Sequence, residues 1–143
     1  MMNEELKKQL RNRRICVVIP TYNNDKTIKT VVEKSLLYCD DVIVVTDGCT
    51  DRTTDILDAI DGITIVSYPQ NRGKGYALKM GFRKALEMGF SYAITLDGDG
   101  QHYPEDIPLF LKANQQHPQS LIIGSRQLEG VDRTKGSSFA NKF

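Results

Sequence analysis

Two aspartates separated by one glycine carry the clearest chemical signal in the sequence. The segment AITLDGDGQH places Asp97, Gly98 and Asp99 directly after an apolar run. Mg²⁺ and Mn²⁺ bind through one or two protein carboxylates together with waters and phosphate oxygens, and glycine lets a ligand approach the backbone closely. The pair therefore predicts a site for a divalent cation and a diphosphate. A solvated Asp-Gly turn is the plainer alternative, which the position after a central strand disfavours.

Two other chemistries use aspartates at this spacing. An EF-hand loop starting at Asp97 needs glycine at its sixth position and glutamate at its twelfth, where the sequence has His102 and Pro108. The EF-hand interpretation therefore fails. A phosphohydrolase would use Asp97 as the nucleophile and Asp99 as the acid or base, and this reaction is retained as an alternative.

The loop IPTYNND follows the first apolar run of the chain. It offers a rigid ring, a hydroxyl, an aromatic face and an amide, from Pro20, Thr21, Tyr22 and Asn23. Groups of this kind can recognise a base and a ribose. Asn24 could, like Asn23, offer hydrogen bonds to such a ligand, but Asn24 and Asp25 are interpreted more simply as caps of the following helix.

The loop DGCTD follows the second apolar run. We expect Asp47 and Gly48 to lie where the polar edge of a nucleoside could be held. Thr50 or Asp51 is expected to do no more than cap the next helix.

The segment NRGKGYA joins Lys74 and Gly75 to the start of a helix, where free backbone N–H groups and the helix dipole favour an anion. It lacks the Gly-Lys-Ser/Thr ending of a Walker loop, so we expect it to line a sugar-diphosphate pocket. A plain turn before a helix explains Lys74, taken singly, equally well. Arg126 in IIGSR could approach a phosphate, although a surface arginine is the default.

Apolar runs alternate with helical spacings and define the elements that must position these loops. Short β-branched runs predict strands at 15–19, 42–46, 63–67, 92–96 and 121–124. Apolar residues at helical spacing predict helices around 28–39, 56–60 and 78–89 and a fourth that Pro104 opens. This alternation predicts a parallel sheet covered by helices, with all four polar loops at the edge where ligands bind.

Length, charge and cysteines set the class of protein. The chain has 143 residues and a net charge of +1, which predicts one domain and no nucleic-acid partner. Its three cysteines lie at no metal-ligand spacing, which favours a reducing, cytoplasmic compartment. No apolar run reaches the roughly 18 residues of a membrane span, so membrane association would come only from segments outside this chain.

Three segments are predicted. Residues 1–14 form a polar N-terminal extension, residues 15–128 form the ligand-binding α/β domain, and residues 129–143 begin an acceptor-side region. An apolar pattern restarts at Phe139 and Phe143, so we expect a longer protein that is truncated here on its C-terminal side.

The ordered motifs IPTYNN, VVTDGCTDRT, NRGKGYALKMGF, LDGDGQHYPEDIP and IIGSR together resemble family 2 glycosyltransferases of the GT-A fold. Within that family they are most similar to the dolichol- and polyprenyl-phosphate sugar transferases of cell-envelope glycan or glycolipid synthesis. The resemblance implies a Rossmann-like, three-layer α/β/α fold with a mostly parallel sheet. It also implies inverting transfer from a UDP- or GDP-linked sugar to a lipid-phosphate or saccharide acceptor.

The resemblance also implies roles for individual residues. It places Asp97, Asp99 and Gln101 near Mg²⁺ or Mn²⁺, with Asp99 as the candidate catalytic residue, and Pro20, Tyr22 and Asp47 near the nucleoside. The sequence shows no acidic general base, which a phosphate acceptor, already anionic, would not need. A non-catalytic nucleotide-binding module is the third hypothesis, beside the transferase and the phosphohydrolase.

Overall fold

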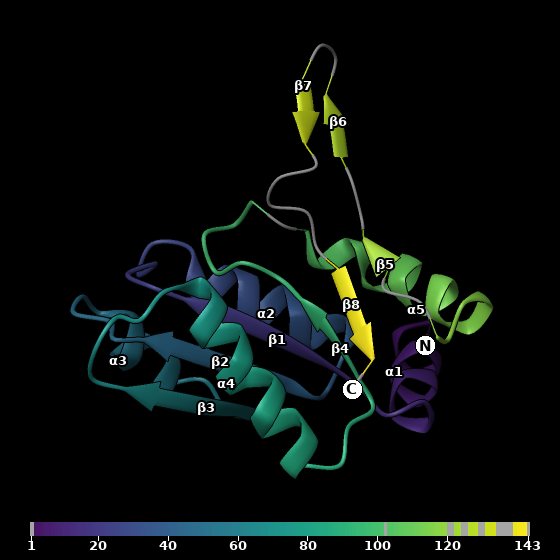
Figure 1. Cartoon of the computed structure of the whole chain (residues 1–143), viewed down its shortest axis with the longest axis horizontal. Helices are drawn as coiled ribbons and strands as arrows, with labels where there is room; N and C mark the ends of the chain where they lie inside the picture. Colours follow the sequence, from purple (N-terminus) through teal and green to yellow (C-terminus); the bar gives the residue numbers. More distant parts are fainter. Residues whose placement is uncertain are drawn as a thin grey trace.

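A computed structural model gives the fold of the chain (Figure 1). It describes residues 2–101, 103–119, 122–123, 126–128, 131–133 and 139–142, and side chains only within 3–101 and 103–119. Helices lie on both faces of a central sheet, as the alternation of strands and helices predicted.

The main sheet has the strand order β3-β2-β1-β4-β8-β5. Its four parallel strands are β1 (Ile15–Thr21), β2 (Val42–Asp47), β3 (Ile63–Tyr68) and β4 (Tyr92–Thr95). They match the predicted runs to within two residues at each end. The mostly parallel sheet is therefore confirmed.

The far edge of the sheet differs from a simple parallel series. The predicted last strand is β5 (Ile122–Ile123), but β8 (Phe139–Lys142) lies between β4 and β5 and runs antiparallel to both. The sheet thus includes residues beyond 128, where the sequence predicted an acceptor-side region. A separate two-stranded sheet pairs β6 (Arg126–Leu128) with β7 (Val131–Arg133).

Four helices begin within four residues of their predicted starts: α2 (Ile28–Tyr38), α3 (Thr53–Asp58), α4 (Lys74–Glu87) and α5 (Ile107–Gln116). A further helix, α1 (Met2–Asn12), was not predicted. Pro104 opens α5 through a short 3₁₀ turn, η1 (Pro104–Asp106), because proline lacks the N–H that the first turn does not need.

The N-terminal segment is more than a polar extension. Leu6 and Leu10 stand four residues apart on α1, and Leu10 is 1% exposed within the core. Side chains at this spacing share one face of a helix, so the two leucines fasten α1 to the domain. The prediction of a polar extension at 1–14 overlooked this pair.

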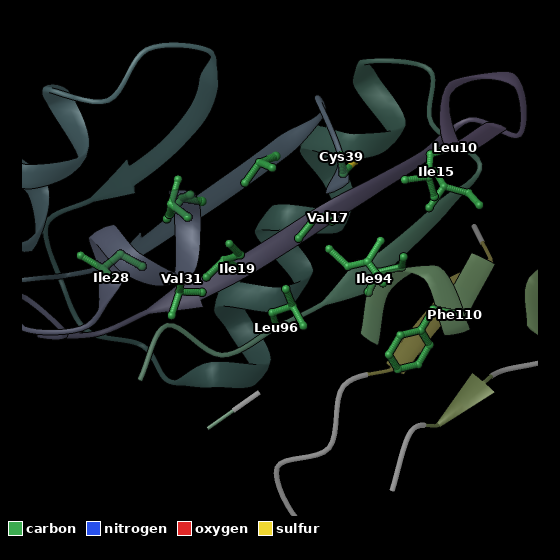
Figure 2. Close-up of a cluster of buried hydrophobic side chains, with 14 of the residues drawn as sticks. Leu10, Ile15, Val17, Ile19, Ile28, Val31, Cys39, Ile94, Leu96 and Phe110 are labelled. Atoms are coloured by element: carbon green, nitrogen blue, oxygen red, sulfur yellow. The ribbon is translucent and has the colours of Figure 1, made fainter. Parts of the chain in front are cut away.

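One face of the sheet carries the larger core, shown in Figure 2. Successive side chains of a strand point to opposite faces, and Ile15, Val17 and Ile19 of β1 point to this one. They pack with residues from α1, α2, α3 and α5, among them Leu10, Val31, Leu57 and Phe110. Four helices therefore cover this face within the described residues.

The opposite face is covered by α4. Cys16 and Val18 of β1 pack there against Ala77 and Ala85 of the helix. Gly81 lies between these alanines, and a Cβ added to it would stand 2.5 Å from Val18 Cγ1. The three small residues recur every four positions, so α4 packs close to β1 and β2 and its first turn lies beside their carboxyl ends.

Candidate functional site

The carboxyl ends of β1, β2 and β4 and the first turn of α4 surround a cavity of about 300 Å³. We call it the switch-point cavity, because β1 lies between β2 and β4: the chain adds β2 and β3 on one side of β1 and then crosses over to add β4 on the other side. Eight predicted site residues line it: Pro20, Thr21, Tyr22, Asp47, Lys74, Asp97, Gly98 and Asp99. The structure thus brings the four predicted loops to one cavity.

Asp97 forms an ion pair with Lys74 in this cavity. Lys74 Nζ lies 2.7 Å from Asp97 Oδ1 and 2.9 Å from Oδ2, so it bridges both oxygens of the carboxylate. The Asp97 side chain is 17% exposed and that of Lys74 is 52% exposed. The position beside Asp97 therefore suits a cation that remains open to solvent on one side.

Asp99 lies on the same wall of the cavity and is fixed by the next turn. Its Oδ1 accepts a 2.9 Å hydrogen bond from the backbone N–H of Gln101. The Gln101 side chain is exposed and does not line the cavity. Its implied contact with a metal stays a prediction.

Divalent cation binding fits this arrangement. Within the described residues there is no group of three or more His, Cys, Asp or Glu side chains that could enclose a metal by themselves. Two carboxylates on one wall, Asp97 and Asp99, instead suit an ion that takes its remaining oxygens from water and phosphate. The ammonium of Lys74 beside Asp97 shows that the carboxylate attracts a cation.

Gly98 fastens this turn to the loop after β1. Its N–H donates to Pro20 O at 3.2 Å, and its carbonyl accepts a 2.7 Å hydrogen bond from Thr27 Oγ1. A Cβ on Gly98 would stand 2.7 Å from Thr21 Oγ1. Glycine is therefore required here by the close approach of two loops, and a role in ligand binding stays a prediction.

The loop after β1 is organised by Asn24, which the sequence analysis treated as a helix cap. Its Oδ1 accepts hydrogen bonds from Thr21 Oγ1 at 2.6 Å and from the Tyr22 N–H at 3.2 Å. The cap of α2 is Thr27, without a side-chain hydrogen bond, so the prediction of an Asn24 or Asp25 cap was wrong. Tyr22 is 48% exposed at the cavity, where its ring can meet a planar base.

Asn23 does not line the cavity. It adopts a left-handed backbone (φ 51°), which asparagine tolerates. Its Oδ1 accepts from the N–H groups of Thr50 at 2.8 Å and Asp51 at 3.2 Å, and its Nδ2 donates to Thr50 Oγ1. The side chain therefore ties the loop after β1 to the loop after β2.

Asp51 has the structural role that was predicted, although the N-cap of α3 is Arg52 and not Thr50 or Asp51. Its Oδ1 accepts a 2.9 Å hydrogen bond from the N–H of Thr53, the first residue of α3, and its Oδ2 accepts one from Asp25. Burial alone would raise the pKa of Asp51, but hydrogen bonds from Thr53 and Asp25 outweigh it and hold the pKa below its usual value.

Asp47 is committed to the loop before α4. Its buried carboxylate, 3% exposed as a residue, accepts hydrogen bonds from Arg72 N at 2.8 Å, Gly73 N at 3.0 Å and Asn71 Nδ2 at 3.0 Å. A carboxylate has about four acceptor sites, so three are used within the protein. Contact of Asp47 with a nucleoside stays a prediction, whereas its organisation of the loop is observed.

The same loop passes very close to Gly48. A Cβ on Gly48 would stand 2.2 Å from Asn71 N, and its φ of 66° is the left-handed conformation that favours glycine. Gly48 itself does not line the cavity. It acts by letting the loop before α4 lie against the end of β2.

Aromatic and cationic packing supports the outer side of this loop. The Arg72 guanidinium lies 4.7 Å from the centroid of the Tyr76 ring, which meets Tyr68 edge-on at 5.2 Å. Burial raises the pKa of the Tyr68 hydroxyl, with the Asp47 carboxylate adding to the effect. These contacts connect the loop before α4, through Arg72, with the first turn of α4 and the end of β3.

The first turn of α4 offers a site for an anion. Its N-terminal residue is Lys74, and the N-cap residue is Gly73, which has no side chain that could accept hydrogen bonds from the N–H groups of the first turn. Free N–H groups at a helix N-terminus attract phosphate. Gly75 is exposed and does not line the cavity, so its predicted ligand contact is not brought to the same place.

Two residues named above cannot be placed, because the side chain of Arg126 and all of His102 lie outside the described residues. Four lining residues were not among the predicted site residues: Asn24, Asn71, Gly73 and Ala77. The sequence signal of the first three is their position in polar loops at the ligand edge, whereas Ala77 lies within α4.

An open α/β sheet with a carboxylate pair and a helix N-terminus at its switch point is an arrangement typical of nucleotide-binding domains. The chain belongs to glycosyl transferase family 2, which it matches over residues 16–139. The predicted resemblance to this family is therefore confirmed.

Two relatives with stated activities illustrate the match. The UDP-N-acetylglucosamine--dolichyl-phosphate N-acetylglucosaminyltransferase of Methanococcus voltae is 32% identical over 129 residues, covering 78% of this chain and 51% of that protein. The undecaprenyl-phosphate mannosyltransferase of Micrococcus luteus is 33% identical over 123 residues, covering 82% of this chain and 50% of that protein. The chain thus spans about half the length of these relatives.

Solved structures show the same fold. Glucosyl-3-phosphoglycerate synthase from Mycobacterium tuberculosis, crystallised with uridine diphosphate, superposes with a TM-score of 0.72 at 23% identity, covering 97% of this chain and 60% of that one. Its complex with Mn²⁺, uridine diphosphate and glucosyl-3-phosphoglycerate has a TM-score of 0.65 at 27% identity, covering 84% and 46%. The predicted GT-A type of α/β fold is confirmed.

Proposed function

We propose that this chain binds a nucleoside-diphosphate sugar in the switch-point cavity and serves an inverting transfer of the sugar to a polyprenyl or dolichyl phosphate. The observation that carries the proposal is the meeting of Asp97 and Asp99 with Lys74 at one cavity. Carboxylates on one side and a helix N-terminus on the other match the two parts of a metal-bound diphosphate.

Each wall of the cavity then has a part in holding the donor. Asp97 and Asp99 would bind Mg²⁺ or Mn²⁺, which supplies charge neutralisation to the departing diphosphate. Lys74 and the first N–H groups of α4 would bind phosphate oxygens. Tyr22, half exposed at the rim, would stack on the base, with Pro20 and Thr21 holding its loop at the end of β1.

Support for the donor and acceptor classes comes from the relatives. Both named transferases carry a lipid phosphate in their names, and the crystallised synthase binds uridine diphosphate with Mn²⁺. A lipid phosphate is anionic at neutral pH, so its attack on the sugar requires no general base. The described part of the chain has no helix that is both long and apolar enough to cross a membrane.

The other hypotheses have less support. A phosphohydrolase would use Asp97 as its nucleophile, and family membership argues against that reaction. A non-catalytic nucleotide-binding module shares the cavity and differs only in the absence of transfer.

A transfer assay tests the proposal. Purified protein is incubated with Mn²⁺, undecaprenyl phosphate and radiolabelled UDP-glucose or GDP-mannose, and label in the lipid phase is measured. We expect metal-dependent lipid labelling that Asp99→Asn abolishes and that Asp58→Asn, an exposed acid on α3 outside the cavity, leaves unchanged. Binding of a donor without lipid labelling would instead support the non-catalytic module.

A further inference from the structure

The ion pair between Lys74 and Asp97 joins two groups that the proposed function needs apart. Asp97 must offer its oxygens to a divalent cation, and Lys74 must reach the diphosphate, yet here Nζ lies 2.7 and 2.9 Å from the two Asp97 oxygens. One ammonium cannot bridge that carboxylate and also bind a phosphate in full. The two ligands and the ion pair therefore compete for the same atoms.

We propose that Lys74 is an exchangeable counter-ion: it fills the cation position at Asp97 when donor is absent and moves to the diphosphate when the divalent cation takes its place. This inference rests on the proposed function and adds a positioning role for Lys74. The ion pair with Asp97 and the contact with the diphosphate are then alternative positions of one side chain.

The charged residues that line the cavity explain why Lys74 pairs with Asp97. Among the described lining residues, the acids are Asp47, Asp97 and Asp99, and Lys74 is the one basic side chain. Asp47 is already satisfied by three hydrogen bonds. Lys74 is therefore the one basic side chain that the described lining offers to the carboxylate pair, and it is released when a divalent cation neutralises the pair more strongly.

The backbone allows the exchange without a change of fold. Lys74 is the first residue of α4, and the preceding Gly73 is held by its hydrogen bond to Asp47. Only the flexible four-carbon stem has to move. With Lys74 52% exposed, the ion pair is solvent-screened, and pairs of this kind are weak enough to be displaced.

Exchange has a thermodynamic consequence. A diphosphate that attracts Lys74 frees Asp97 for the cation, and a cation at Asp97 frees Lys74 for the diphosphate. Linkage requires each ligand to raise the affinity for the other by the same factor. Lys74 thus contributes to cooperative binding of metal and nucleotide and opposes metal binding when nucleotide is absent.

Mn²⁺ binding without nucleotide tests the exchange. Free Mn²⁺ is measured by electron paramagnetic resonance during titration of the wild type, Lys74→Met and Lys79→Met, where Lys79 is an exposed lysine of α4 outside the cavity. Removing a partly screened competing charge should raise Mn²⁺ affinity about three- to tenfold in Lys74→Met. Lys79→Met, which removes the same charge from the same helix, should stay within about twofold of the wild type.

In a second titration, with nucleotide, we expect Lys74→Met to bind more weakly than the wild type. With Mn²⁺ saturating, the affinity of Lys74→Met for UDP and GDP should fall about tenfold, since a charged hydrogen bond to phosphate is lost. Unchanged or weaker Mn²⁺ binding by folded Lys74→Met, or no Mn²⁺ binding by either protein, would overturn the exchange. Metal-dependent nucleotide binding by the wild type would still stand in that case, so failure of the exchange and failure of the proposed function give different results.

Discussion

The carboxylate of Asp47, at the end of β2, accepts a 3.0 Å hydrogen bond from the backbone N–H of Gly73, the residue before α4. Two further hydrogen bonds, from Arg72 and Asn71, complete the anchor. The end of β2 therefore fixes the residue that precedes α4. The position of Lys74 depends on this connection.

Replacing Asp47 with alanine should loosen the loop and the cavity together. Three donors would lose a buried acceptor, so we expect the free energy of unfolding to fall by about 2 to 4 kcal/mol. Asp47→Asn can keep an acceptor oxygen toward Asn71 and Gly73 and should lose roughly half as much. Urea unfolding of the three proteins measures the effect, and equal stability of wild type and Asp47→Ala would contradict the anchor.

Gly48 tests the close approach of the same loop. Gly48→Ala and Gly62→Ala both place a side chain at positive φ, which costs about 1 to 2 kcal/mol in each. A Cβ at Gly48 also meets Asn71 N at 2.2 Å, whereas at Gly62 nothing lies within 4 Å. Thermal unfolding should therefore show a clearly larger loss for Gly48→Ala. Equal losses in the two variants would mean that the loop moves away at no cost.

Asp51 should make stability depend on pH in the acid range. Hydrogen bonds lower its pKa in the folded state, so its contribution is complete above the unfolded value of about 3.9 and is lost as pH falls through the folded value. Asp51→Asn should lower the free energy of unfolding by about 1 kcal/mol at neutral pH.

The difference between wild type and Asp51→Asn should narrow when urea unfolding is repeated near pH 3. Asp58→Asn removes an exposed acid at the end of α3. It serves as the control and should show no such change. If the free energies of unfolding of wild type and Asp51→Asn differed by the same amount at both pH values, the contribution of Asp51 would not depend on its charge.

Local sequence patterns predicted the four parallel strands, the helices α2 to α5 and the family of the chain. The run at Val42 predicted a strand that the structure has as Val42–Asp47, because β-branched residues on both faces suit a buried parallel strand. Parallel strands then place their loops at one edge, so the gathering of Asp97, Lys74 and Tyr22 at one cavity followed from order alone.

Hydrogen bonds and strand pairing between residues far apart in the chain could not be predicted from local sequence patterns. Asn23 and Asp47 were predicted to face a ligand, yet their hydrogen-bond partners lie more than 20 residues away in the chain. Strand order across the sheet is also set by tertiary packing, so the place of β8 between β4 and β5 could not be read from periodicity. The leucine pair of α1 was hidden among charged neighbours.

Calorimetric titration with UDP-glucose and with GDP-mannose, with and without Mn²⁺, tests the donor site most directly. We expect the wild type to bind at least one of them only when Mn²⁺ is present, and Asp99→Ala to lose that binding while remaining folded. Binding that is indifferent to both Mn²⁺ and Asp99, or the absence of binding by well-folded wild-type protein, would contradict a metal-dependent donor site in this cavity.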